Sequence, residues 1–450
     1  MLHARLIRLA ILIWISVTYT FASAEDQENE DTAINLILPV FDYPFNQVHG
    51  VSYPSYQQSL NVTRAFYQIP HHSAAYYWGE DHPILTTSGI VLFDVYFAFF
   101  PYSSAWLHEE WHRGVLTNRQ IDSYNGIYDM SSEATVPVKN IRDEELVRLK
   151  AEHPAEMVQL HAAGLNAQAA LNFSMEKDAF FFNKSRWDLP NVWLNYLMNN
   201  FYLYTCSDGD GDLLTDELYD REDTNISARD FTGMDCNGWV YDLHRPNEAY
   251  NERGSHPSGV GIDRYIKTTD LTNKELDYLK LQTRLNLINL INPYLFGKMY
   301  FSAINPLTQS LLRWTFSLKH QLAPFGYTLG ANILVKQDIW NVVLTGLIYQ
   351  SENQTLPGIE AELVHFPLKL LHQPSYFNAR IAMWLQPKNQ LFASDEWNPG
   401  GSLSLGLTQM FTERLGVYAE TQIKTQGWIA DTLHLQNNLN ARVGIFARMF

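Results

Sequence analysis

The stretch NLNARVGIFARMF, residues 438–450, alternates apolar and polar residues along almost its whole length. One face carries Leu439, Ala441, Val443, Ile445, Ala447 and Met449. A period of two residues is typical of a β-strand with one apolar face. The same pattern recurs in segments of roughly ten residues from about Thr308 onward. We predict about eight strands, near 311–319, 326–336, 339–349, 358–366, 377–386, 401–412, 414–425 and 438–450.

This run of strands, ending in Phe450, resembles a small bacterial outer-membrane β-barrel. The resemblance implies a closed antiparallel barrel that is seated in the outer membrane. Such barrels usually place the terminal aromatic residue on the apolar face, whereas Arg442 and Arg448 share the face of Phe450 here. A soluble antiparallel barrel or sandwich is the alternative.

The preceding part of the chain predicts helices. Residues 86–116 are strongly apolar, and Pro101 divides them into two helices. Further helices are expected from Pro154, from Pro190 and from Asp277, the last interrupted by Pro293. The fold class is therefore α+β and multidomain. We expect an α-rich domain over 25–305, followed by an antiparallel barrel-like domain over 306–450.

Residues 1–24 have the features of a secretory signal peptide. Arg5 and Arg8 precede the short apolar run 9–17, and Ala22-Ser23-Ala24 has the form of a cleavage site. An N-terminal anchor is the alternative interpretation. Export would allow Cys206 and Cys236, the only two cysteines, to form a disulfide. The net charge of −16 argues against nucleic acid as a partner.

The motif LHEEWH, residues 107–112, predicts a metal site. His108 and His112 are four residues apart, so a helix presents both imidazoles on one face. Glu109 is suited to take a proton from a metal-bound water. The motif resembles the H-E-x-x-H helix of the zincin metallopeptidases, although Glu110 and Arg113 replace the uncharged residues usual there. The resemblance implies zinc and hydrolysis of a peptide bond.

A third protein ligand is needed to complete a zinc site of this kind. We expect Glu156, which lies in the first turn of the helix from Pro154 and resembles the glutamate ligand of one zincin branch. His161 is the second choice, and Glu133 and Asp143 remain possible.

The stretch CSDGDGDLLTDEL, residues 206–218, resembles an EF-hand calcium loop. In that register Asp208, Asp210 and Asp212 stand at loop positions 3, 5 and 7, Gly211 makes the turn, and Glu217 is the bidentate ligand at position 12. Cys206 replaces the usual aspartate at position 1. A second register resembles the short calcium repeats of exported proteins, with Asp208, Asp210, Asp212 and Asp216 as ligands. We expect this calcium to order the loop 206–236.

Together these patterns predict an exported zinc metallopeptidase that acts on a peptide or protein and is associated with the outer membrane. The periplasm is the alternative location. A protein of another class fits the same sequence: a non-catalytic outer-membrane β-barrel protein with a calcium-stabilised helical domain that binds partners or plugs a pore.

Overall fold

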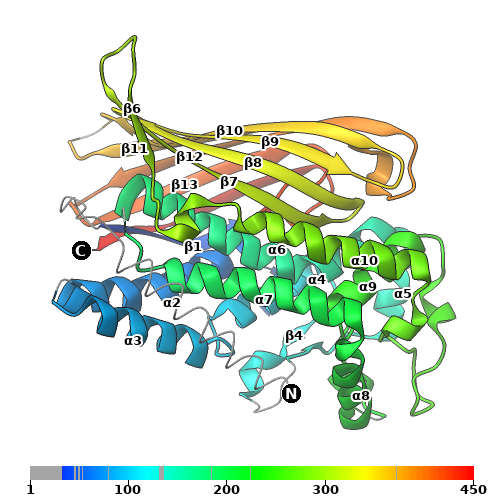
Figure 1. Ribbon diagram of the computed structural model, residues 1–450. Coiled ribbons are helices and arrows are strands. Elements are labelled where there is room, and N and C mark those ends of the chain that lie inside the picture. The colour runs from blue at the N-terminus through cyan, green and yellow to red at the C-terminus, as the bar shows by residue number, and fades with distance from the viewer. Residues whose placement is uncertain are drawn as a thin grey trace.

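A helical layer packs against one face of a large antiparallel sheet in the computed structural model (Figure 1). The structure describes residues 33–44, 47–48, 51–52, 54–79, 81–130, 136–183, 185–222, 224–370 and 372–449. The predicted signal peptide, residues 1–24, lies outside the described residues.

The sheet contains all of the predicted strands and two more. The predicted ones are β7 (Leu311–Ala323), β8 (Gly326–Gln337), β9 (Trp340–Gln350), β10 (Thr355–Leu368), β11 (Ser375–Pro387), β12 (Trp397–Met410), β13 (Leu415–Lys424) and β14 (Asn438–Met449). They follow one another in the sheet in chain order. The additional strands, β1 (Ile34–Tyr43) and β6 (Phe301–Ile304), form its two edges. The α+β class is thus confirmed, and the described strands form an open ten-stranded sheet rather than the expected closed barrel.

Strand β1 brings the start of the described chain into the sheet. It pairs antiparallel with β14, with Ile34 opposite Met449 and Tyr43 opposite Ala441. A segment from the predicted helical domain therefore completes the sheet of the predicted C-terminal domain.

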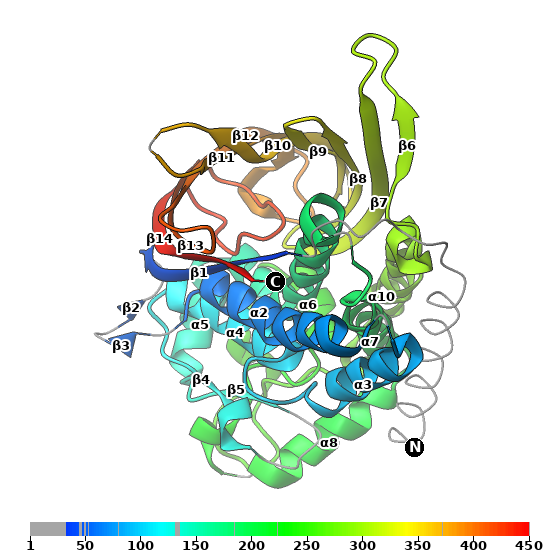
Figure 2. The ribbon, with the colours of Figure 1, turned by 90° about the vertical axis from the view of Figure 1, so that its left-hand side faces the viewer.

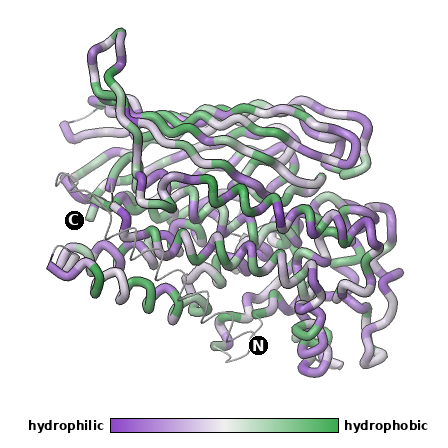
Figure 3. Tube along the Cα trace, in the orientation of Figure 1, coloured by the Kyte–Doolittle hydropathy of each residue, from purple (hydrophilic) through white to green (hydrophobic). Residues whose placement is uncertain are grey.

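The apolar positions of the alternating strands face outward. Ile333, Met383 and Ile445 are 45%, 57% and 48% exposed, whereas the intervening residues Asn332 and Arg442 are buried on the inner face. Hydrophobic residues recur along the strands in Figure 3. The inner face and the helices line a cavity of about 250 Å³, whose wall includes charged residues such as Lys319, Glu360 and Arg380.

The helices are α2 (Tyr56–Ala74), α3 (Pro83–Tyr96), α4 (Ser104–Asn118), α5 (Asp143–Glu152), α6 (Pro154–Asp178), α7 (Leu189–Asp208), α8 (Asp210–Glu222), α9 (Asp235–His244) and α10 (Asn273–Leu285). Prolines stand in the first turn of α3, α6 and α7, where the missing N–H costs nothing. The predicted break near Pro101 separates α3 from α4. Among the described residues, no helix is both long and apolar enough to cross a membrane.

Helices α2 and α6 lie under the curled sheet (Figure 2). Their side chains satisfy backbone groups of β1 and β7. Gln58 and Arg64 of α2 donate to the carbonyls of Pro39 and Asn35 in β1, at 3.0 and 3.2 Å. Asn166 of α6 donates to the carbonyl of Leu322 in β7 at 3.1 Å. Covering the edge strand β1 with a helix in this way limits its pairing with another chain.

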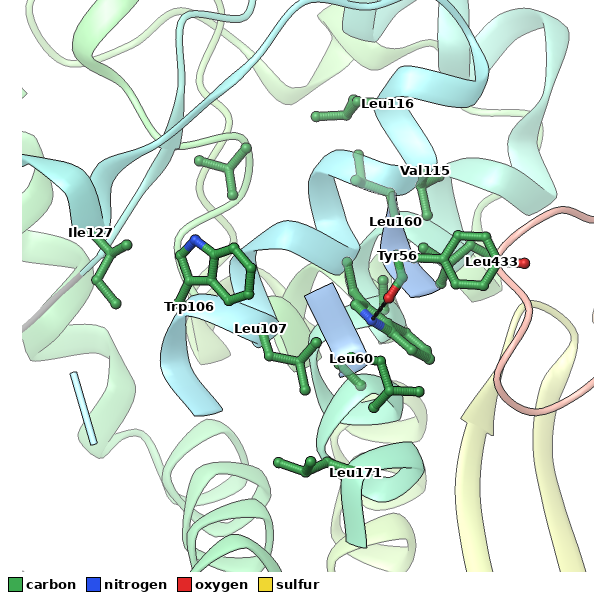
Figure 4. Close-up of a cluster of buried hydrophobic side chains, with 14 of the residues drawn as sticks. Tyr56, Leu60, Trp106, Leu107, Val115, Leu116, Ile127, Leu160, Leu171 and Leu433 are labelled. Atoms are coloured by element: carbon green, nitrogen blue, oxygen red, sulfur yellow. Dashed lines mark hydrogen bonds between the residues drawn. The ribbon is translucent and has the colours of Figure 1, made fainter. Parts of the chain in front are cut away.

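Helix α4 is anchored by its apolar face in the main core. Leu107, Trp111 and Val115, one turn apart, are at most 2% exposed. Figure 4 shows Leu107 and Val115 packed with Tyr56 and Leu60 of α2 and with Leu433, which comes from the segment before β14. With this face buried, the adjacent face, which carries His108 and His112, is held against α6 and α9.

Candidate metal centre

Three side chains from two distant parts of the chain converge beside α4. The Nε2 atom of His108 lies 2.9 Å from Oδ2 of Asp235, and Nε2 of His112 lies 3.3 Å from the same oxygen. One potential ligand atom from each residue lies within 4.8 Å of the other two. Within the described part of the chain, this is the one group of His, Cys, Asp or Glu residues that meets this criterion.

The surroundings of His112 select the tautomer that a metal requires. Its Nδ1–H donates to the carbonyl oxygen of Leu160 in α6 at 2.5 Å. In the neutral ring Nε2 therefore carries the lone pair, and it faces Oδ2 of Asp235 at 3.3 Å. A ligand histidine typically has its second nitrogen bonded to a carbonyl or carboxylate in this way.

The ring of His108 fits against a glycine of α6. A Cβ atom on Gly164 would lie only 2.2 to 2.4 Å from three atoms of the His108 imidazole. The small residue at 164 therefore lets α4 and α6 approach closely enough for His108 to reach Asp235.

Asp235 is positioned by its own neighbours. It stands at the first residue of α9, where a negative charge is favoured by the helix dipole. Its backbone N–H donates to the hydroxyl of Tyr202 in α7 at 3.1 Å. The next residue, Cys236, forms a disulfide with Cys206 near the end of α7, which confirms the predicted pairing. The disulfide thus fixes α9 to α7 one residue away from the metal candidate.

The charges of the cluster are coupled. Burial opposes ionisation of Asp235, but His112 and His108 outweigh it and hold the pKa of Asp235 below its usual range. Burial also works against protonation of His112, but Asp235 outweighs it and raises the His112 pKa. Burial lowers the pKa of His108. Burial raises the pKa of Glu109 well above its usual range, and the charges of Asp235 and Asp230 add to the rise.

The donor set fits zinc. Two imidazole nitrogens and one carboxylate oxygen are the ligand types of catalytic zinc sites, in which a fourth position is left for water. Ligands about 2.0 to 2.1 Å from a tetrahedral ion lie about 3.3 Å apart. The 3.3 Å between His112 and Asp235 matches that value, and the 2.9 Å between His108 and Asp235 is the length of a hydrogen bond.

The described residues that were expected as the third ligand have other partners. Glu156 forms a two-pronged ion pair with Arg119, so its carboxylate is already neutralised. His161 is bonded through Nε2 to Asp242 at 2.8 Å. Asp143 pairs with Arg264. Glu133 lies outside the described residues.

Asp235 was not predicted from the sequence, although Cys236 beside it offered a clue. The disulfide ties α9 to α7, which lines the cavity next to His108.

The predicted calcium loop is helical on both sides of a single turn. Helix α7 continues to Asp208, Gly209 adopts a φ of 89°, and α8 begins at Asp210. Asp212 accepts hydrogen bonds from the backbone and hydroxyl of Thr268.

The other acidic residues of this stretch point to separate surroundings. Asp216 pairs with Lys267, and Glu217 is exposed. Asp208 accepts the backbone N–H of Asp210. The carboxylates do not form the ring of ligands that an EF-hand requires. Calcium binding here stays a prediction and would need this turn to rearrange.

A cavity of about 300 Å³ opens beside the metal candidate. His108, Glu109 and Asp235 contribute to its wall. Much of the remaining lining is apolar and comes from several helices and from the turn after α3: Val95, Phe99, Leu165, Leu194, Met198 and Leu214. Binding sites typically combine such an apolar hollow with a few convergent polar groups.

A second buried charged cluster lies between α2, α3 and α7. His71 bonds to Asp94 through Nε2 at 2.8 Å and to Asp188 through Nδ1 at 3.1 Å. His72 also bonds to Asp188 at 3.1 Å. Burial opposes protonation of His71, but Asp94 and Asp188 outweigh it and raise the His71 pKa to about 10. This cluster ties three helices together.

No protein-family model, curated protein or solved structure matches this chain. The function must therefore be inferred from the site itself.

Proposed function

We propose that this chain is an exported zinc-dependent hydrolase that cleaves an amide bond, with the peptide bond as the case expected from its HExxH motif. The observation that supports it most directly is the convergence of His108, His112 and Asp235 beside a cavity whose wall also holds Glu109. The site is assigned to zinc because of its donor types and their spacing.

Each residue has a distinct role in this proposal. His108, His112 and Asp235 hold the ion, which when bound would acidify a water and polarise the substrate carbonyl. Glu109 receives the proton of that water and passes it to the departing nitrogen. The Leu160 carbonyl keeps His112 in the ligand tautomer, and the Cys206–Cys236 disulfide keeps Asp235 in place.

Zinc content and turnover test the assignment separately. Glu109→Gln keeps all three ligands, so it should bind one zinc per chain and lose turnover by orders of magnitude. Asp235→Ala should lose the zinc. Glu156→Gln, which alters the residue first expected as a ligand, should keep it. If Asp235→Ala holds zinc as tightly as the wild type, the ligand set is wrong. If Glu109→Gln is fully active, the proposed base is wrong.

A second proposal rests on the sheet instead of on the His108, His112 and Asp235 cluster. In it the chain is a non-catalytic outer-membrane protein whose helical layer binds a partner or plugs a pore. The outward apolar positions of the strands, such as Ile333, Met383 and Ile445, support an environment of lipid. Both proposals place the protein at the outer membrane, with the periplasm as the alternative. Purified protein without zinc and without amidase activity would favour the second proposal. Recovery with salt-washed outer membranes would support the location.

A further inference from the structure

The cavity beside the metal candidate points to a substrate class that the HExxH motif does not specify. We propose that the site acts on amides of long-chain carboxylic acids, with the acyl chain lodged in the cavity and entering from the side of α3. The proposal rests on the proposed hydrolase function.

The cavity suits a hydrocarbon chain. Leu165, Leu194, Met198 and Leu214 give it an apolar wall supplied by three helices. The polar residues His108, Glu109 and Asp235 provide the hydrolytic groups in the same cavity. A chain whose carbonyl lies at the cluster would thus have apolar walls for its hydrocarbon part.

A peptide backbone would find less support here. A bound peptide usually adds a strand to a sheet edge, because its N–H and C=O groups need partners. Val136 and Pro137 line the cavity, and the described strands before and after them in the sequence are short. These strands, β4 (Tyr124–Asn125) and β5 (Val138–Lys139), have two residues each. Helical side chains make up most of the wall, and a hydrocarbon chain needs no backbone partners.

The surface at one side of the cavity is also apolar. Val95 and Phe99, which line the cavity, are 42% and 53% exposed. On the same segment, Leu85, Leu92 and Tyr96 are each 70% exposed. Hydrophobic residues recur along α3, the helix at the lower left in Figure 3.

This segment carries almost no charge. Between residues 83 and 102 the one charged side chain is Asp94, which is 1% exposed and bonded to His71. Tyr76, Tyr77 and Trp78, just before α3, are at least 58% exposed. Exposed tyrosine and tryptophan side chains are enriched where a membrane meets water. An acyl chain can pass from such an interface into the cavity without crossing water.

The reaction balances without another co-reactant. The oxygen of water bonds to the acyl carbon, and the carbon–nitrogen bond breaks. The proton of that water moves through Glu109 to the departing nitrogen. The second proton of the water leaves when the acid ionises and is taken up by the amine, so the products are a long-chain carboxylate and a protonated amine.

The test compares two amides of one fluorescent amine, a dodecanoyl amide and an acetyl amide, with the zinc-loaded full chain. Each buried methylene strengthens binding, so kcat/KM should be about 100-fold or more higher for the dodecanoyl amide. Leu214→Trp fills the cavity and should lower that kcat/KM by about 10-fold or more. Leu213→Trp is the matched control, because Leu213 is 68% exposed on the same helix and should change neither rate.

The outcomes separate this inference from the proposed function. If both amides are cleaved at equal rates, or if Leu214→Trp acts like Leu213→Trp, the hydrolase stands and the acyl-chain assignment is wrong. If neither amide is cleaved, binding of the dodecanoyl amide to zinc-loaded Glu109→Gln decides. If the amide binds and adding Leu214→Trp to that variant abolishes the binding, the acyl cavity is supported without the reaction. If the amide does not bind, the acyl-chain assignment is overturned.

Discussion

Gly164→Ala should destroy the metal site while leaving the helix that carries it intact. The added Cβ would lie 2.2 Å from Nε2 of His108, whereas ordinary contacts begin at 3.4 Å. The imidazole must therefore move by much more than the roughly 0.2 Å that a zinc–nitrogen distance tolerates. Loss of an outer-shell partner alone typically costs 10- to 100-fold in metal affinity. We expect loss of the ligand itself to weaken zinc binding by about 100-fold or more.

Competition with a chromophoric chelator measures this loss. Gly89→Ala is the matched control, because Gly89 is also helical and a Cβ there meets nothing within 4 Å. Alanine in place of a helical glycine stabilises by roughly 0.5 to 1 kcal/mol, so the control should melt slightly higher and bind zinc normally. At Gly164, overpacking of about 1 to 3 kcal/mol opposes that gain. Wild-type zinc affinity in Gly164→Ala would refute the ligand geometry.

Three further predictions concern the rest of the helical layer. Because the His71 pKa is raised from 6.5 to about 10, its contribution to stability is complete below pH 6.5 and is lost as the pH rises through 10. Between pH 6.5 and 10 the unfolding free energy of the wild type should fall by roughly 3 to 5 kcal/mol more than that of His71→Asn, as measured by denaturant titrations. An equal pH dependence of the unfolding free energy in the two proteins would contradict this. Replacing both disulfide cysteines with serine should lower zinc affinity about 10-fold or more, and an unchanged affinity would show that Asp235 needs no such support. Calcium should raise the melting temperature of the wild type and not that of Asp210→Ala. Glu217→Gln should also lose this rise if the EF-hand register is right. If calcium leaves the melting temperature of the wild type unchanged, the calcium prediction is wrong.

The strands could be predicted because their signal is local. Alternation within each segment gives a strand whichever face is buried, and each predicted segment forms one. Strand β1 could not be predicted in the same way. Its sequence, INLILPVFDY, is mostly apolar and contains Pro39, so it has no clear period. Its partner, β14, lies at the opposite end of the described chain.

The candidate metal site shows the same difference between local and long-range signals. His108, Glu109 and His112 lie within one helical turn, so the sequence alone places them together. The third candidate ligand, Asp235, depends on tertiary packing. Glu156 is nearer in the chain, but Arg119 pairs with it. Asp235 is 127 residues beyond His108 and reaches it because α9 is fixed to α7 and packed against α6.

The inward arginine that departed from the barrel pattern has a structural role. Arg442 of β14 pairs with Asp42 of β1 at 3.1 Å and donates to the hydroxyl of Tyr56 in α2 at 3.1 Å. The carbonyl of Tyr56 in turn accepts the indole N–H of Trp111 at 3.2 Å. Trp111 lies on α4 with His108 and His112, so polar contacts run from the sheet to the helix of the candidate site. An apolar residue at 442 would leave Asp42 buried without its cation, and loosened packing of α4 would follow.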